Sequence, residues 1–434
     1  MEKFFKLKER GTDVRTEIMA GITTFMTMAY ILAVNPYFLS QAGMEFGKVF
    51  AATAITSAIA TLIMGIFANL PFALSAGMGL NAFFAYTVCL GMGYPWQWAL
   101  SAIFVEGIIF ILMTFFNIRE AIVNSIPATL KKAIGGGIGL FIAYIGLKNA
   151  GIIISDAGSV SALNPAWFQG ASGVAIIGII LTSFLLVRKV KGALLIGIIL
   201  TTLIGIPFGV TTYAGGSFLP TTPYFLNFAF GEIFASSKSI FDFVVVTFTF
   251  LFVDMFDTVG TPIGCAGKSG IVQPDGSIPN CKEALFADAV GTTLGAALGT
   301  STVTTFVESA SGVAEGGRTG LTAVTVAVLF LFSLFLEPLF GSIPSAATAP
   351  ALVIVGVMMI TPITEIDFTD YSDAIPAFLT ILFMVCASSI SDGIMFGILS
   401  YVVMKLSVRE FRSLQPTIWV VTILFIAKII ISAL

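Results

Sequence analysis

Long hydrophobic stretches alternate with short polar ones along the whole chain. A membrane-spanning helix needs about 20 apolar residues. The apolar stretches here lie near 16–36, 48–69, 72–90, 95–116, 128–148, 170–188, 191–211, 238–258, 284–300, 303–317, 320–340, 345–361, 376–391, 393–406 and 416–433. Several are short or merge with a neighbour, so the pattern predicts thirteen to fifteen spans. The last stretch is compatible with a final span, a half-span or a helix lying in the membrane interface.

Composition strengthens the prediction of an all-α polytopic membrane protein. Of the 434 residues, 57% are hydrophobic and only 10% are charged, whereas about 25% are charged in soluble domains. A net charge of −3 without long charged runs argues against a nucleic-acid partner. The four cysteines are far apart, without the spacing of a metal site. Histidine is absent, so a proton exchanged near neutral pH would have to be carried by a carboxylate.

Basic residues gather at alternate ends of the predicted spans and so indicate their orientation. They precede the first span and follow the fourth, sixth, eighth, tenth and fourteenth, whereas residues 212–236 contain no Lys or Arg. Because positive residues are retained on the cytoplasmic side, we expect a cytoplasmic N-terminus in a multi-pass protein of the plasma (inner) membrane. The first apolar stretch directly follows a charged N-terminal segment, so we expect it to be a signal anchor.

The two halves of the chain resemble each other at two places. Ser125-Ile126-Pro127 precedes the fifth span and Ser342-Ile343-Pro344 the twelfth, half a chain length further on. The segment KGALLIG at 191–197 likewise resembles DGIMFG at 392–397. With seven spans in each half, the second copy would be inverted in the membrane. Inverted repeats of this kind are typical of secondary transporters.

Two predicted spans at corresponding places are interrupted by small and polar residues. The third contains LPFALSAGMGLNAFF (Leu70–Phe84), and the tenth contains TSTVTTFVESASGVAEGG (Thr300–Gly317). Irregular backbone inside a membrane is tolerated only where it is buried in protein or lines a cavity. A pair of interrupted segments in the two halves is a strong pointer to a binding site at the membrane midplane.

Acidic residues within the predicted spans are the main functional candidates. A charged side chain at mid-membrane costs at least about 2.5–3.5 kcal/mol, so an acid retained there has a function by default. Glu308 lies in the interrupted tenth segment. Asp254 and Asp257 are three residues apart, on one face of the eighth span, although Asp257 could also cap a helix end. Glu106 in the fourth span could be a structural acid bonded between helices.

Polar and aromatic residues near the interrupted segments complete the predicted site. Asn81 is the polar residue of the third span; its alternative role is to form hydrogen bonds with backbone groups that the interruption leaves unpaired. Thr24, Phe83 and Val307 are further candidates for substrate contact. Carboxylates accept hydrogen bonds from adjacent N–H groups, such as those of guanine, and an aromatic ring can stack on a flat base. These acids would repel an anionic substrate, so we expect a neutral or cationic one. Protonation of one acid is a natural way to couple proton movement to transport, because removal from water raises the pKa of a carboxylic acid.

Two other classes of protein stay open from these residues alone. A sulfate-permease-like anion transporter is disfavoured because its site would need positive groups. An intramembrane aspartyl enzyme could use Asp254 and Asp257 as its acid pair. No nucleophile–base pair, nucleotide loop or metal cluster is evident in the sequence. We therefore predict a secondary transporter with no catalytic residues, no metal and no cofactor.

Four motifs together resemble a known family. They are GITTFMTMAYIL (Gly21–Leu32), SAGMGLNAFFAY (Ser75–Tyr86), VDMFDTVGT (Val253–Thr261) and TTFVESASGVAEGGRTG (Thr304–Gly320). The chain is similar over essentially its whole length to the purine permeases of the nucleobase–cation symporter-2 group, in the AzgA-like branch.

The resemblance implies an architecture. It implies fourteen spans in two inverted repeats of seven, with short β-strands in spans 3 and 10 near Ser75–Gly79 and Ser301–Phe306. After a cytoplasmic N-terminus at 1–15, a core domain would comprise spans 1–4 (16–116) and spans 8–11 (238–340). A gate domain would comprise spans 5–7 (117–212) and spans 12–14 with the C-terminal segment (341–434). Residues 213–237 would be an extracellular connection, and the gate domain a possible homodimer surface.

The resemblance also implies a function and roles for residues. It implies proton-coupled uptake of adenine, guanine or hypoxanthine by an elevator-like or rocking movement of core against gate. By this resemblance, Glu308 and Asp254 correspond to the two acids that bind the purine. Asp257 corresponds to the acid that is needed for transport and proton coupling, with Asp254 as the alternative coupling residue. Asn81 corresponds to the residue of the third span that lies in the binding site. Ser309 stands where the xanthine and uracil branches carry Asn, so a uracil/xanthine permease is the less favoured alternative.

Overall fold

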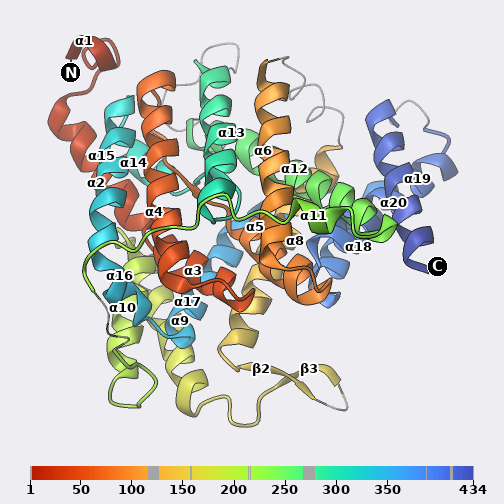
Figure 1. Ribbon diagram of the computed structural model, residues 1–434, viewed down its shortest axis with the longest axis horizontal. Coiled ribbons are helices and arrows are strands. Elements are labelled where there is room, and N and C mark those ends of the chain that lie inside the picture. The colour runs from red at the N-terminus through yellow and green to blue at the C-terminus, as the bar shows by residue number, and fades with distance from the viewer. Residues whose placement is uncertain are drawn as a thin grey trace.

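The computed structural model describes residues 2–115, 127–156, 159–213, 215, 217–266, 279–387, 389–410 and 414–433. Within these ranges, the side chains of residues 3, 155–156, 159–160, 255–266, 417, 424, 428 and 431–433 are outside the description. Helices make up most of this part of the chain, and Figure 1 shows them as one bundle with the N-terminus at one end.

The helices of the first half are α1 (Glu2–Phe5), α2 (Val14–Met28), α3 (Ile31–Gln41), α4 (Phe46–Ile63), α5 (Met78–Ala82), α6 (Trp96–Phe115), α8 (Ala128–Asn149), α9 (Gly170–Val187) and α10 (Ala193–Gly205), with π-helices η1 (Met64–Ala68) and η2 (Phe83–Gly91). The second half has α11 (Phe230–Ile233), α12 (Ser237–Ala266), α13 (Cys281–Leu298), α14 (Ser309–Ala314), α15 (Gly320–Ser333), α16 (Glu337–Gly341), α17 (Ser345–Met359), α18 (Tyr371–Cys386), α19 (Ile390–Ser407) and α20 (Pro416–Ala433), with 3₁₀-helices η3 (Leu334–Leu336) and η4 (Thr361–Glu365). The strands are β1 (Leu74–Ala76), β2 (Ile153–Asp156), β3 (Ser159–Leu163) and β4 (Val303–Thr305).

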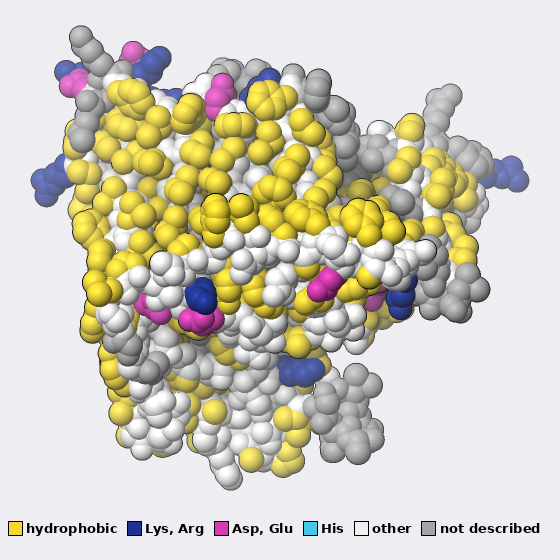
Figure 2. Space-filling model, viewed as in Figure 1, with side chains coloured by type: hydrophobic (Ala, Val, Ile, Leu, Met, Phe, Trp, Pro, Cys, Tyr) yellow, Lys and Arg dark blue, Asp and Glu magenta, His cyan; other side chains and the backbone are white. Residues whose placement is uncertain are grey.

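Eight stretches of helix among the described residues are long and apolar enough to cross a membrane. They are Val14–Gln41, Phe46–Ala68, Trp96–Phe115, Ala128–Asn149, Gly170–Val187, Gly320–Gly341, Ser345–Glu365 and Ile390–Ser407. Figure 2 shows a broad hydrophobic band over the region where Figure 1 places α4, α13 and α6, with charged side chains above and below it. The chain is thus a multi-pass membrane protein. The count of fourteen spans, their inverted repeat and the division into core and gate domains stay predictions.

Elements from the two halves of the chain pack together in two groups. Helices α2 and α4 contact α15, and α4 and α6 contact α13; elsewhere α8, α9 and α10 contact α17 (Figure 1). Each group therefore combines one segment from the first half with one from the second. The hairpin of β2 and β3 extends from the end of α8, with Ile153 opposite Leu163.

The proline-containing repeats precede equivalent helices. Pro127 is the residue before α8 and Pro344 is the residue before α17, where a missing N–H costs no helical hydrogen bond. The two helices approach closely at Gly139 and Gly356, which are as far apart in sequence as the two prolines. A Cβ on Gly139 would lie 2.9 Å from the Gly356 carbonyl oxygen, and one on Gly356 would lie 2.5 Å from the Gly139 oxygen. Glycine at both positions allows this close helix–helix contact.

Buried polar contacts fix the beginning of α2 against α15. The Asp13 carboxylate accepts hydrogen bonds from the backbone N–H groups of Arg15 and Thr16, which caps α2. One turn later, the buried Glu17 carboxylate accepts hydrogen bonds from the Arg318 N–H (2.8 Å) and the Thr322 hydroxyl (2.6 Å) at the start of α15. An acid at a helix N-terminus is favoured by the free N–H groups and the helix dipole. These contacts hold α2 in position for the site described next.

Candidate functional site

Two short strands bring the interrupted segments together. Strands β1 and β4 pair antiparallel, with Leu74 opposite Thr305 and Ala76 opposite Val303. The pairing continues at both ends, because Phe306 donates to the Ala73 carbonyl (2.9 Å) and Gly77 donates to the Thr302 carbonyl (3.0 Å). The strands overlap the segments near Ser75–Gly79 and Ser301–Phe306 but are three residues each. Their place within spans 3 and 10 of a fourteen-span arrangement stays a prediction.

A cavity of about 630 Å³ lies against this strand pair. Its first wall comes from α2 and the interrupted segments: Thr27, Tyr30, residues 77–79, residues 304–308 and Ser311. Its second wall comes from the group around α8 and α17: Gly135, Leu186, Val190, residues 192–194, Val355, Met358, Met359 and Pro362. The cavity therefore lies between the two packing groups, and its size is in the range of small-molecule sites.

Glu308 provides the carboxylate of the cavity wall. It immediately precedes α14, and its backbone has helical dihedral angles. The buried Tyr30 hydroxyl donates a hydrogen bond of 2.7 Å to Glu308 Oε1. Among the described side chains, Tyr30 is the one that donates to this carboxylate. One oxygen is thus held by the protein, while the residue as a whole faces the cavity.

The segment that carries Glu308 is anchored to α2 and to the strand β1. Ser311 donates to the Glu308 carbonyl (2.7 Å) and its hydroxyl lies 2.9 Å from the Thr27 hydroxyl. Ser309 accepts a hydrogen bond from the Ala73 N–H (3.0 Å). A Cβ on Gly312 would lie 2.6 Å from a carbonyl oxygen of α2, so α14 packs directly on that helix. The position of Glu308 therefore depends on α2.

Asn81 lies in α5, directly after the β1 segment, and is fully buried. The Ser301 hydroxyl donates to its Oδ1. Its amide nitrogen has no hydrogen-bond partner among the described residues. The side chain is not part of the cavity wall in this conformation. Its role in binding stays a prediction.

The two aspartates lie on α12, which packs against β4 and α14. The Asp254 side chain is fully buried and is not one of the residues that line the cavity. The side chain of Asp257 is outside the described residues. The structure therefore brings the helix of Asp254 next to the Glu308 segment, and the functions of both aspartates stay predictions.

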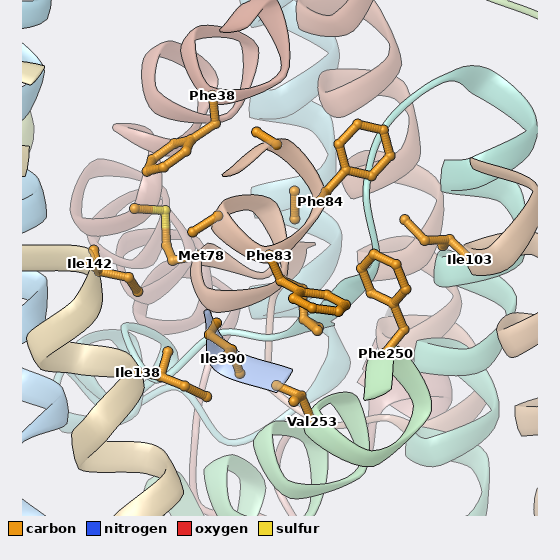
Figure 3. Close-up of a cluster of buried hydrophobic side chains, with 14 of the residues drawn as sticks. Phe38, Met78, Phe83, Phe84, Ile103, Ile138, Ile142, Phe250, Val253 and Ile390 are labelled. Atoms are coloured by element: carbon orange, nitrogen blue, oxygen red, sulfur yellow. The ribbon is translucent and has the colours of Figure 1, made fainter. Parts of the chain in front are cut away.

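The remaining candidate residues have different surroundings. Val307 is 52% exposed and lines the cavity. Phe83 lies in the apolar interior, where its ring meets the edge of Phe250 at 4.9 Å between centroids (Figure 3). Thr24 is buried where α2 meets Gly312 of α14. Phe83 and Thr24 are thus away from the cavity wall in this conformation, and their contact with a substrate stays a prediction.

Several cavity residues were not predicted as part of the site. Thr27 belongs to a cluster of hydroxyls in the first span, with Thr23 and Thr24, and a threonine in a helix most often bonds to its own backbone. Tyr30 was not anticipated, and its spacing of three residues from Thr27 was the signal that could have identified it. The second wall consists of apolar residues and glycines, such as Val190, Met358 and Met359. Residues of this kind are common throughout the chain, so nothing in the sequence marks them as part of a site.

One ion pair joins the two packing groups beside the cavity. Lys191 Nζ lies 2.6 Å from Glu315 Oε1. Lys191 follows the cavity residue Val190 in the turn between α9 and α10, and Glu315 is the residue after α14. The pair therefore connects the turn of one group to the segment of the other that carries Glu308.

The amino-acid sequence is similar over nearly its whole length to known permeases. The sequence model of the Permease family matches residues 15–396. The protein named "Putative permease MJ0326" of Methanocaldococcus jannaschii is 47% identical over 99% of this chain and 98% of its own length. Adenine permease AdeP of Escherichia coli is 41% identical, over 99% of this chain and 96% of its own. Guanine/hypoxanthine permease PbuO of Bacillus subtilis is 41% identical, over 98% of this chain and all of its own.

Solved structures share the fold at much lower sequence identity. The transmembrane domain of the cyanobacterial bicarbonate transporter BicA matches with a TM-score of 0.67 and 15% identity, over 88% of this chain and 97% of that domain. The transporter SLC26A9 matches with a TM-score of 0.66 and 12% identity, over 90% of this chain and 65% of its own. These similarities extend to the fold alone.

Proposed function

The chain belongs to the Permease family, and we propose that it imports purine nucleobases (adenine, guanine or hypoxanthine) together with protons. Membership of this family makes it a transporter and not an enzyme. The observation that carries the proposal is the Glu308 carboxylate, which lies on the wall of a cavity of about 630 Å³ between the two packing groups. Relatives at about two-fifths identity over nearly the whole chain are named as adenine and guanine/hypoxanthine permeases.

The chemistry of the cavity supports a neutral base with N–H donors as substrate. A carboxylate accepts hydrogen bonds from N–H groups, with gains of about 1.5–3 kcal/mol for bonds to a charged partner. The second wall offers apolar contact through Val190, Met358 and Pro362, which suits the faces of a flat ring. Asn81 and Asp254, both buried near this segment, would complete binding when the site closes around a base.

Proton coupling is the natural partner of such a site. The chain has no histidine, so a carboxylate must carry the proton near neutral pH. We assign this role to Asp257 or Asp254 on α12, the helix that packs against the Glu308 segment. Protonation would remove a charge that otherwise opposes movement of that group through the membrane. No further cofactor enters this scheme.

The arrangement of the cavity supports alternating access. Its first wall belongs to the proposed core domain (16–116 and 238–340) and its second wall to the proposed gate domain (117–212 and 341–434). An elevator-like or rocking movement of one against the other would expose Glu308 to each side in turn, as in other transporters built from inverted repeats. We place the protein in the plasma membrane with a cytoplasmic N-terminus, and the gate domain is the proposed surface of a homodimer.

Two alternatives from the same fold differ in substrate. A uracil/xanthine permease shares the family, and substrate competition distinguishes it. An anion transporter shares the fold of BicA and SLC26A9, but Glu308 and its neighbouring acids would repel an anion.

Uptake of radiolabelled bases tests the proposal. Cells expressing the chain are given adenine, guanine, hypoxanthine, xanthine or uracil, with and without a protonophore. We expect uptake of at least one of the three purines named above, and its loss with the protonophore. Absence of uptake for every base would overturn the proposed substrate class, and uptake that is insensitive to the protonophore would overturn the coupling.

A further inference from the structure

We propose that Tyr30 is a positioning residue that holds the Glu308 carboxylate ready for the base and favours its ionised form. This inference rests on the proposed function of Glu308 and extends it to a residue on a different helix. The two side chains are 278 positions apart in sequence and meet through one hydrogen bond of 2.7 Å at the cavity wall.

The Tyr30 ring is fixed in one place. The residue is 1% exposed and joins α2 to α3, with helical dihedral angles of φ −56° and ψ −25°. Its carbonyl accepts hydrogen bonds of 3.0 Å from Ala33 and Val34, and its ring is part of the main apolar cluster. Since a close-packed ring has little freedom, the hydroxyl oxygen stays at a fixed position beside the Glu308 carboxylate.

The main chain of Glu308 is held by α2, the helix that ends just before Tyr30. Thr27, one turn before Tyr30, lies 2.9 Å from the Ser311 hydroxyl, which in turn donates to the Glu308 carbonyl at 2.7 Å. Thus Thr27 of α2 supports the backbone of the Glu308 segment, and Tyr30, just after α2, supports the carboxylate. Because the backbone of Glu308 and its Oε1 atom are both held by hydrogen bonds, the second carboxylate oxygen, Oε2, has a defined direction.

This arrangement has two chemical consequences. A phenol donates to an ionised carboxylate more strongly than to a neutral acid, so Tyr30 favours the form of Glu308 that accepts N–H bonds from a base. The phenol oxygen also keeps acceptor capacity after donating its hydrogen. It is therefore a second acceptor next to the carboxylate, a pattern that fits two adjacent N–H donors on one edge of a purine.

The test uses the purified full-length protein in proteoliposomes, with KM and maximal rate measured for the transported purine over a range of pH. In Tyr30→Phe, we expect KM to rise about tenfold, the loss typical of one hydrogen bond to a charged group, with the maximal rate within about twofold of wild type. The pH at which KM begins to rise on acidification should move upward, because the ionised carboxylate has lost its donor.

Tyr94→Phe is the matched control. Tyr94 donates a 2.8 Å hydrogen bond to Asp242, so this variant loses the same kind of contact at residues outside the cavity wall. Its KM and pH profile should match wild type. If Tyr30→Phe does not fold, 3-fluorotyrosine at position 30 keeps the ring and the hydroxyl while strengthening the donor. That variant should move the acidic rise in KM to lower pH.

The outcomes separate this inference from the proposed function. Wild-type transport with an unchanged KM and pH profile in the position-30 variants would overturn the role of Tyr30 and leave purine transport intact. Equal effects of Tyr30→Phe and Tyr94→Phe would reduce Tyr30 to a structural residue and would also overturn it. Absence of purine transport by the wild-type protein would overturn the proposed function itself.

Discussion

The ion pair between Lys191 and Glu315 gives a direct test of movement between the two packing groups. The pair joins the α9–α10 turn to the end of α14 at 2.6 Å. If the proposed core and gate domains move against each other, this contact exists in one conformation and is broken in the other. Changing the pair should therefore shift the population of the conformation seen here.

The size of the shift follows from the exposure of the two side chains. Lys191 is 57% exposed and Glu315 is 34% exposed, so the pair should contribute only up to about 1 kcal/mol. Lys191→Glu replaces this attraction by a repulsion of similar size, for a total of about 1–2 kcal/mol. A change of that size alters a two-state population ratio by about 5- to 30-fold.

Cysteine labelling measures this population. Met358 lines the second wall and is 37% exposed, so a cysteine there reports whether the cavity is accessible. The Met358→Cys change is introduced after replacement of the four native cysteines. Inside-out vesicles, which expose the cytoplasmic side where the basic turn with Lys191 is predicted to lie, are then treated with a membrane-impermeant maleimide. Labelling should slow in Lys191→Glu and in Glu315→Lys, and it should recover when both changes are combined. High salt should weaken each effect, since both charges are partly in solvent.

The double variant decides the outcome. A double-mutant cycle isolates the coupling between two residues, so recovery in the swapped pair is the expected signature. Labelling that is no faster in the double variant than in either single variant would show that the pair does not bridge moving parts. Unchanged labelling in all three variants would refute the reasoning.

Two further predictions concern stability. Glu17→Ala removes a buried carboxylate that accepts hydrogen bonds at the start of α15, and it should lower the free energy of unfolding in detergent by about 3 kcal/mol; the exposed Glu9→Ala should have little effect, and equal stability of the two variants would contradict this role. Gly312→Ala places a methyl group against Thr24 and should cost about 1–3 kcal/mol through overpacking. Gly231→Ala, which has open space at its Cβ, is the matched control in the same thermal unfolding assay, and a loss as large as that of Gly312→Ala would contradict the packing argument.

Much of the fold class is contained in the sequence. Hydrophobic stretches of membrane-spanning length predicted a polytopic helical protein, and eight stretches of helix among the described residues meet this requirement. The close contact between Gly139 of α8 and Gly356 of α17 fits the similarity of the two halves, because these glycines are as far apart in sequence as Pro127 and Pro344. Span number was harder to predict, because shorter apolar helices such as Met78–Gly91 and Ala193–Gly205 lie between the clear spans.

The candidate site was predicted less completely, for physical reasons. Glu308 was identifiable because an acid in an apolar, interrupted segment has no other evident reason to be there. Tyr30 was missed because its importance arises from a contact across 278 positions, and a single tyrosine in an apolar helix looks like a packing residue. Met358 and Val190 were missed because they contribute shape and apolar surface, which many residues of this chain could supply.

The central claim is that Glu308 accepts hydrogen bonds from a purine base in this cavity. The most direct measurement is equilibrium binding of radiolabelled adenine, guanine or hypoxanthine to purified protein, comparing wild type with Glu308→Gln. The amide keeps the shape of the side chain but has no charge, so we expect Kd to rise at least about tenfold, while Glu45→Gln at the surface leaves Kd unchanged. Wild-type affinity in Glu308→Gln would contradict the account.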